Sequence, residues 1–246
     1  MFKIILFYIL ILITFIAYSH NPEDLIIAEI EQGQLNFENK QIATEYNAGL
    51  KRLRIRRLAS MPAVKKFLIF TKAGFEHIIP KGLDHIIFVL GLFFSCLKKR
   101  TLFYQVTTFT IAHSITLILA ALEIITINGN IIEPLIALSI MWIAIENCLF
   151  KEISKWRYLI IFIFGLLHGL GFATVLSQYG LPNDNFTFLL LAFNIGVEIG
   201  QISILLLAYI IIRLILNNSW ESQKIKIPVS LIIGLIGFIW FIERIS

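Results

Sequence analysis

The chain has 246 residues, of which 58% are apolar and only 15% are charged, and its mean hydropathy is +0.83. A water-soluble domain carries about 25% charged residues, so this composition excludes such a domain and predicts an all-α polytopic bundle with the lipid bilayer as its partner. The formal charge of +5 comes from short Lys and Arg clusters between apolar runs, which is typical of membrane topology and not of nucleic-acid binding.

The first 19 residues predict a signal peptide. Met1–Lys3 is a short basic start, Ile4–Ile16 is an apolar run, and Ala17–Ser19 supplies small residues for a cleavage site. An uncleaved anchor is the alternative, because the run is almost long enough to span a bilayer. In either case we expect the segment that follows to lie outside the cytoplasm.

Residues 20–80 form a polar lead-in, in which an acidic part gives way to a basic part. The polar part has too few apolar residues for a core of its own, so we expect an external segment and not a separate domain. Between Leu50 and Phe70, basic and apolar residues mix at helical spacing. This pattern is typical of an amphipathic helix on a membrane surface.

Six apolar runs follow and predict a transmembrane domain over residues 81–246. Their expected bounds are 82–97, 101–127, 131–150, 158–178, 186–214 and 228–243. Basic loops such as Lys98–Arg100 alternate with uncharged ones such as Asn128–Asn130. Because positive loops stay in the cytoplasm, the first span should begin outside. We therefore expect the lead-in to lie outside the cytoplasm, which for a protein of the bacterial cytoplasmic (inner) membrane is the periplasm.

Several ionisable and polar side chains lie in or beside these runs, where burial in hydrocarbon is costly and indicates function. The candidate metal ligands are His77, Asp84, His85, His113, His168 and Glu198. The candidate supporting groups are Ser114, Asn194, Gln201, Glu146 and Asn147. Imidazole and carboxylate are the usual ligands of divalent transition metals.

Each of these groups also has a structural interpretation. Hydroxyl and amide side chains often hydrogen-bond between membrane helices. Asp84 could orient a histidine without binding metal itself. Glu198 could be a buried partner of a histidine, and Glu146, near the inner end of its span, could pair with a cytoplasmic lysine.

Counting about 1.5 Å per residue along each span predicts that these groups lie in layers. The groups expected near mid-membrane are His113, His168, Asn194 and Glu198. Asp84 and His85 are expected near the outer surface, and Glu146 towards the inner one. Layers favour a path for a cation, whereas a catalytic centre would gather its ligands at one depth.

Five segments between Gly74 and Gln201 resemble the HupE/UreJ family of bacterial membrane proteins. They read GFEHIIPKGLDHIIFVLGLFF, QVTTFTIAHSITL, EPLIALSIMWIAIEN, FGLLHGLGFA and FNIGVEIGQ. The family is linked to hydrogenase and urease accessory functions, and its better-known branch is regarded as nickel or cobalt permeases. The His-x5-Asp-His and His-Gly motifs of that branch fall here on His77, Asp84, His85 and His168-Gly169. Six residues, not five, separate His77 from Asp84.

These observations and the resemblance predict a permease for a divalent transition-metal cation, with nickel favoured and zinc or cobalt as alternatives. Asp84 and His85 would capture the ion at the outer mouth, and the mid-membrane groups would pass it inward. The chain carries no Walker motif, so any ATP dependence would need a partner.

Two other functions stay open. One is an intramembrane metal-dependent (zinc) hydrolase, in which Ser114 and Glu198 would assist a metal-bound water. The other is a non-transporting assembly factor that works with metalloenzyme maturation proteins. Convergence of the histidines and Asp84 in one coordination sphere, with Glu198 at an open position, would favour the hydrolase. Separated layers would favour the permease.

Overall fold

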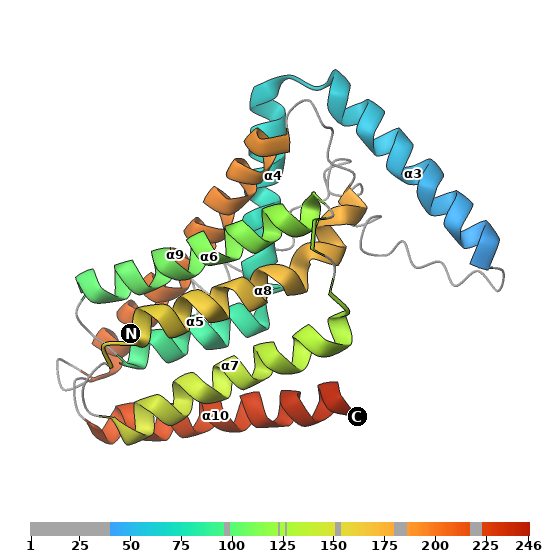
Figure 1. Ribbon diagram of the computed structural model, residues 1–246. Helices are drawn as coiled ribbons and strands as arrows, with labels where there is room; N and C mark the ends of the chain where they lie inside the picture. Colours follow the sequence, from blue (N-terminus) through green and yellow to red (C-terminus); the bar gives the residue numbers. More distant parts are fainter. Residues whose placement is uncertain are drawn as a thin grey trace. The chain divides into compact units, whose positions relative to one another are not determined.

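The regular structure of the described residues is helical throughout (Figure 1). The computed structural model describes residues 40–95, 99–122, 124–125, 127–150, 154–179, 186–216 and 223–246. Its helices are α3 (Lys40–Ser60), α4 (Ala63–Ile78), α5 (Leu83–Ser95), α6 (Lys99–Ala121), α7 (Gly129–Leu149), α8 (Arg157–Tyr179), α9 (Phe186–Leu216) and α10 (Gln223–Ile245). The all-α fold is confirmed, while the predicted signal peptide and residues 20–39 lie outside the described part of the chain.

Each of the six predicted apolar runs coincides with one helix, from α5 to α10. Four of these helices, α6, α7, α9 and α10, are long and apolar enough to cross a membrane. Helices α4 and α5 meet that criterion only as a pair bent by 70°, which brings the candidate spans to five. The apolar part of α8, Arg157–Gly171, is shorter than the length that the criterion requires. A membrane protein is thus supported, and crossing by six separate helices stays a prediction.

The break between α4 and α5 follows from the sequence Ile79-Pro80-Lys81-Gly82. A proline disfavours helical backbone at the residue before it, and Ile79 is extended, with φ −123° and ψ 114°. The chain then turns so tightly that a Cβ on Gly82 would lie 2.3 Å from the carbonyl oxygen of His77. The turn therefore requires glycine, and it allows α5 to leave at a steep angle to α4.

The chain divides into two compact units, Met1–Arg56 and Arg57–Ser246. The first unit holds most of α3. The second holds α4 to α10 and every candidate site residue. Helix α4, although part of the predicted lead-in, lies in this second unit and packs along α9. The side of the membrane on which α4 begins stays a prediction.

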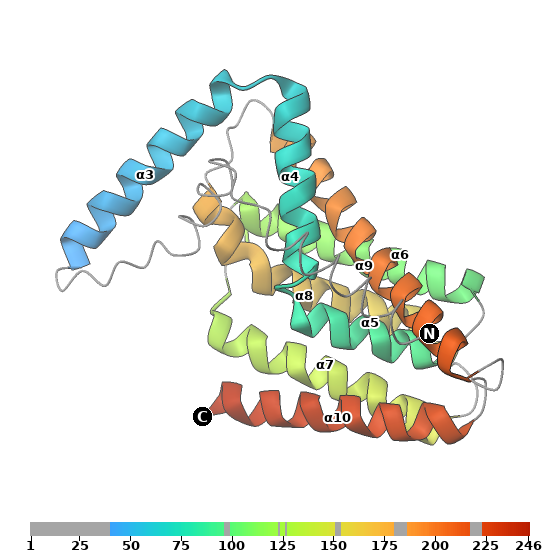
Figure 2. The same cartoon turned by 180° about the vertical axis from the view of Figure 1, so that it is seen from behind.

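Within the second unit the helices pack mainly as three pairs, α6 with α8, α7 with α10, and α4 with α9 (Figures 1 and 2). Helix α5 lies among these pairs, since it contacts α4, α6, α7, α9 and α10. Its side chains Phe88, Val89 and Leu92 are fully buried. The first turn of α5 is thereby fixed inside the bundle by packing.

The break lies opposite the middle of α9. Gly74 of α4 packs on the backbone of Phe193, and Ile78 packs on Gly200, so α4 and α9 run in the same direction. Gly200 is near the centre of α9, which has 31 residues. The last turn of α4 and the first turn of α5 therefore meet opposite the middle of α9, while Pro80, Lys81 and Leu83 at the break itself are exposed.

Candidate metal centre

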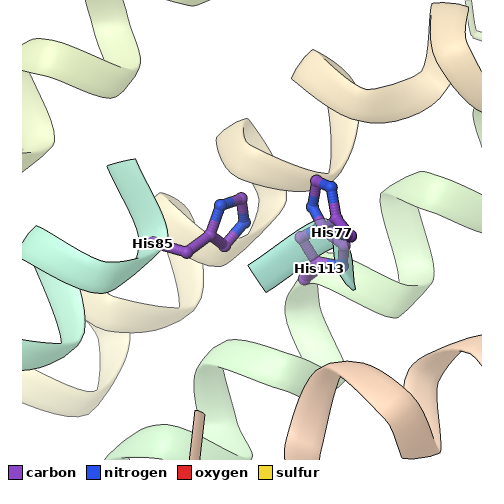
Figure 3. A group of neighbouring side chains, drawn as sticks. All are labelled: His77, His85 and His113. Carbon is purple, nitrogen blue, oxygen red and sulfur yellow. The ribbon is translucent and has the colours of Figure 1, made fainter. Parts of the chain in front are cut away.

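Four histidines from four helices form one group, which we call the histidine cluster. Its members are His77 of α4, His85 of α5, His113 of α6 and His168 of α8. The ring centroid of His85 lies 4.8 Å from that of His77, 5.5 Å from that of His113 and 4.9 Å from that of His168. The ring of His85 points toward those of His77 and His113 (Figure 3). The break makes this possible, because His77 lies in the last turn of α4 and His85 in the first turn of α5.

The ring nitrogens of the cluster suit a metal ion. One nitrogen from each of His77, His85 and His113 lies within 4.8 Å of the other two. An ion bound by imidazole at about 2.1 Å keeps its ligands at most about 4.2 Å apart. Small rotations of the rings would therefore close these nitrogens around an ion.

His168 is oriented as a potential ligand by its backbone. Its Nδ1 lies 2.9 Å from the carbonyl oxygen of Phe164. Since a carbonyl only accepts, Nδ1 carries the proton and Nε2 keeps its lone pair. Metal-binding histidines are commonly held in this way by a hydrogen bond to the other ring nitrogen.

Several nitrogens of the cluster are buried and accept or donate no hydrogen bond among the described residues. They are Nε2 of His85, both ring nitrogens of His113 and Nε2 of His168. Leaving a buried polar atom unpaired costs about 1–3 kcal/mol. Such a concentration of unpaired donors and acceptors at one point indicates that a ligand completes the site.

Aromatic rings surround the cluster. Phe109 lies 5.0 Å from His168 and 5.8 Å from His85, Phe88 lies 5.1 Å from His168, and Phe193 lies 5.7 Å from His77, between ring centroids. These rings exclude water from the imidazoles. The cluster therefore consists of four imidazole rings in an apolar setting.

Gly169 brings α8 close enough to α6 for His168 to reach the cluster. A Cβ on Gly169 would lie 2.2 Å from Oγ1 of Thr116 and 2.3 Å from the carbonyl oxygen of His113. Oγ1 of Thr116 also donates to the carbonyl oxygen of Leu166 at 2.8 Å. The His-Gly sequence thus combines a ligand with the close contact that positions it.

Asp84 is directed to a different partner. Nη2 of Arg244, in the last turn of α10, lies 2.9 Å and 3.1 Å from the two carboxylate oxygens of Asp84. The Asp84 carboxylate is therefore neutralised by a guanidinium beside the cluster. Its role as a direct metal ligand stays a prediction.

A polar seam joins α6 to α9. Oγ1 of Thr107 donates to Glu198 at 3.3 Å, and Oγ1 of Thr110 donates to Oε1 of Gln201 at 2.9 Å. Ser114 donates within its own helix, to the carbonyl oxygen of Thr110 at 2.6 Å. This arrangement is the interhelical hydrogen bonding that membrane helices use.

The seam is not fully satisfied. Oδ1 of Asn194 and Nε2 of Gln201 are buried and have no hydrogen-bond partner among the described residues. Both side chains come from α9, as does Glu198. The seam therefore retains capacity to bind a polar group or an ion.

Glu146 and Asn147 lie apart from these groups and have local partners. Oε2 of Glu146 accepts from Nη1 of Arg157 at 2.5 Å, and the side chains are 6% and 2% exposed. Nδ2 of Asn147 donates to the carbonyl oxygen of Gly91 at 2.8 Å. Both residues thus tie helices together, with Arg157 in the place of the expected lysine.

One expectation about depth is wrong. His85 does not lie in an outer layer separate from His113 and His168, because its ring contacts theirs. The physical reason is the break, which places the first turn of α5 opposite the middle of α9. The depth estimate assumed that Gly82 was at the membrane surface.

Arg244 is a residue of the site that was not expected from the sequence. The sequence does mark it as unusual. If the loops alternate as expected, the end of the last predicted span lies on the outer side of the membrane, where basic residues are less common. Such a residue departs from the usual distribution of positive charge. Its pairing with Asp84, 160 positions away in the chain, explains the exception.

Comparison with known proteins gives one family. The family model described as HupE / UreJ protein matches residues 54–244, which include all the candidate site residues. No curated protein and no solved structure matches the chain.

Proposed function

Since this chain belongs to the HupE/UreJ family, we propose that it is a cytoplasmic-membrane permease for a divalent transition-metal cation, with nickel as the favoured substrate. The observation that carries the proposal is the histidine cluster at the break between α4 and α5. The metal-uptake and accessory roles linked to the family agree with this assignment.

The donor set supports a transition metal. The cluster offers imidazole nitrogens, which suit nickel, cobalt, copper and zinc, while magnesium and calcium prefer oxygen ligands. Affinity order alone does not select nickel among these ions. The preference for nickel, with cobalt or zinc as alternatives, therefore rests on the family.

The position of the cluster supports transport. In many transporters the coupling-ion and substrate sites lie near the bilayer midplane, at helices that are interrupted there. Helices α4 and α5 are such an interrupted pair, and their break faces the middle of α9. In this proposal the polar seam of α6 and α9 receives the ion after the cluster.

A zinc hydrolase is the second candidate, because the histidines converge at one depth as a catalytic centre would. A catalytic zinc site needs an open position and a general base close to it. Here Asp84 is paired with Arg244, and Glu198 accepts from Thr107. Both carboxylates therefore already have partners in this arrangement, which favours binding and release of an ion over hydrolysis.

The experiment is radiolabelled nickel accumulation by cells that express the wild type, His113→Ala or Thr108→Ala. Thr108 serves as the matched control, because it lies in the same helix and only donates to the carbonyl oxygen of Tyr104. We expect His113→Ala to lower uptake roughly 10-fold or more and Thr108→Ala to match the wild type. Equal accumulation in all three strains and in cells with empty vector would overturn the proposal.

Purified protein separates transport from the assembly-factor alternative. We expect proteoliposomes that contain the wild type to accumulate nickel without any soluble partner. Stoichiometric binding without accumulation would instead indicate delivery to metalloenzyme maturation proteins.

A further inference from the structure

A single guanidinium joins three helices beside the histidine cluster. Nη2 of Arg244 contacts both carboxylate oxygens of Asp84, and Nη1 donates to the carbonyl oxygen of Glu133 at 3.1 Å. The guanidinium carbon also lies 5.4 Å from the ring centroid of Trp240. Arg244 thus connects α10 to the first turn of α5 and to α7.

This ion pair lies between the cluster and the exterior of the bundle. The side chains of Arg244 and Asp84 are 21% and 26% exposed. By contrast, His85 is 5% exposed and His168 is 1% exposed. Asp84 immediately precedes His85 in the chain. An ion that approaches the cluster from this exposed side meets the pair first.

The positive charge of Arg244 opposes the binding of a cation in the cluster as long as Arg244 stays on Asp84. A divalent cation is repelled by the guanidinium and attracted by the carboxylate. Nη2 of Arg244 now contacts both oxygens of that carboxylate, while Nη1 is held by the carbonyl oxygen of Glu133. An arriving dication therefore competes with Arg244 for Asp84.

The ion pair of Asp84 and Arg244 is weak enough to break when a cation arrives. Ion pairs that remain partly exposed are weak, whereas removing one partner of a buried pair is strongly destabilising. The pair of Glu146 and Arg157, with side chains 6% and 2% exposed, is of the second kind. Of these two pairs, the one at Asp84 is the pair that can exchange its cation at low cost.

We propose that Arg244 is a gating residue, which holds the carboxylate of Asp84 in the metal-free protein and releases it to an incoming divalent cation. This inference rests on the proposed function, because it requires that the histidine cluster bind the ion. In this role Asp84 attracts the cation, and Arg244 sets the barrier that the cation must overcome.

The test is nickel titration of the purified full-length protein by calorimetry. The variants are Arg244→Gln, Asp84→Asn and the double variant. We expect Arg244→Gln to tighten nickel binding roughly 5-fold or more, because it frees Asp84. In the Asp84→Asn background the same substitution should change the affinity much less, since no carboxylate is released.

Arg213→Gln is the matched control. It removes the same charge from the last turn of α9, where Arg213 donates to the hydroxyl of Tyr209 at 2.8 Å. We expect its nickel affinity to equal that of the wild type. If Arg244→Gln does not yield folded protein, Arg244→Lys replaces it, and a smaller tightening is expected because the positive charge remains while the contact of Nη1 with the carbonyl oxygen of Glu133 is lost.

The outcomes separate the two proposals. Unchanged or weaker nickel binding by folded Arg244→Gln or Arg244→Lys, with normal binding by the wild type, would overturn the gating role and make Arg244 a structural clamp. An equal effect of Arg244→Gln in both backgrounds would also overturn it. No binding by the wild type, or equal binding by wild type and His113→Ala, would overturn the proposed function and the gate together.

Discussion

At the scale of single residues, the cluster is prepared for an ion by the atoms next to it. The hydrogen bond from Nδ1 of His168 to the carbonyl oxygen of Phe164 keeps Nε2 as the free acceptor. Nε2 of His168 and both nitrogens of His113 are buried without a hydrogen-bond partner among the residues that the structure describes. Their cost to the folded protein is offset when an ion binds.

Gly169 should be intolerant of any side chain. Gly169→Ala places a Cβ against the backbone of His113, where 2.3 Å is available, so α8 must move away from α6. We expect a loss of about 1–3 kcal/mol in stability from overpacking and weaker nickel binding, because His168 moves with α8. Thermal unfolding and nickel titration of the purified variant measure the two effects.

Gly49→Ala is the control for that substitution, since a Cβ at Gly49 meets no atom within 4 Å. It should leave nickel affinity unchanged and should not lower stability, because alanine favours the helical backbone of α3 more than glycine does. Wild-type affinity in Gly169→Ala would show that the contact of α8 with α6 does not position His168.

At the scale of secondary-structure elements, the decisive feature is the interruption between α4 and α5. An uninterrupted helix from Ala63 to Ser95 would place His77 and His85 eight residues apart, about 12 Å along the axis. The extended backbone at Ile79 and the tight turn at Gly82 bring the two rings to 4.8 Å between centroids. The geometry of the turn thus determines the relative positions of His77 and His85, two of the four histidines of the cluster.

Gly82→Ala tests this dependence. A Cβ at position 82 would lie 2.3 Å from the backbone oxygen of His77, so the turn must open and His77 must separate from His85. We expect nickel affinity to fall roughly 10-fold or more, with helix content by circular dichroism preserved. A folded variant with wild-type affinity would contradict the role assigned to the break.

The elements themselves were predictable from the sequence, and their mutual arrangement was not. Long apolar runs bounded by polar loops define membrane helices locally, which is why each predicted run coincides with a helix. The bend at Pro80 and Gly82 was visible as a turn sequence, but its depth depends on how α4 packs along α9. The convergence of His85 with His113 and His168 depends on the same long-range packing, which no local pattern encodes.

At the scale of the whole bundle, two ion pairs that join different helices have opposite characters. The pair of Asp84 and Arg244 is partly exposed, and the pair of Glu146 and Arg157 is buried. The buried pair joins α7 to the first turn of α8. Neighbouring Asn147 ties α7 to α5 through the carbonyl oxygen of Gly91. This end of the bundle is therefore fixed, while the end near Arg244 has a contact that can open.

The buried pair should contribute to stability and not to the affinity of the cluster. Glu146→Gln removes the carboxylate oxygen that Nη1 of the buried Arg157 contacts, and we expect a loss of about 3–5 kcal/mol, seen as a lower melting temperature in detergent. Replacing both partners, as in Glu146→Gln with Arg157→Met, should recover much of the loss, because the buried charge is gone. Nickel affinity per folded molecule should stay at the wild-type value in both variants. Lost nickel binding by the folded, stable double variant would instead make Glu146 part of the ion's path, and the bundle would then need a second mobile end.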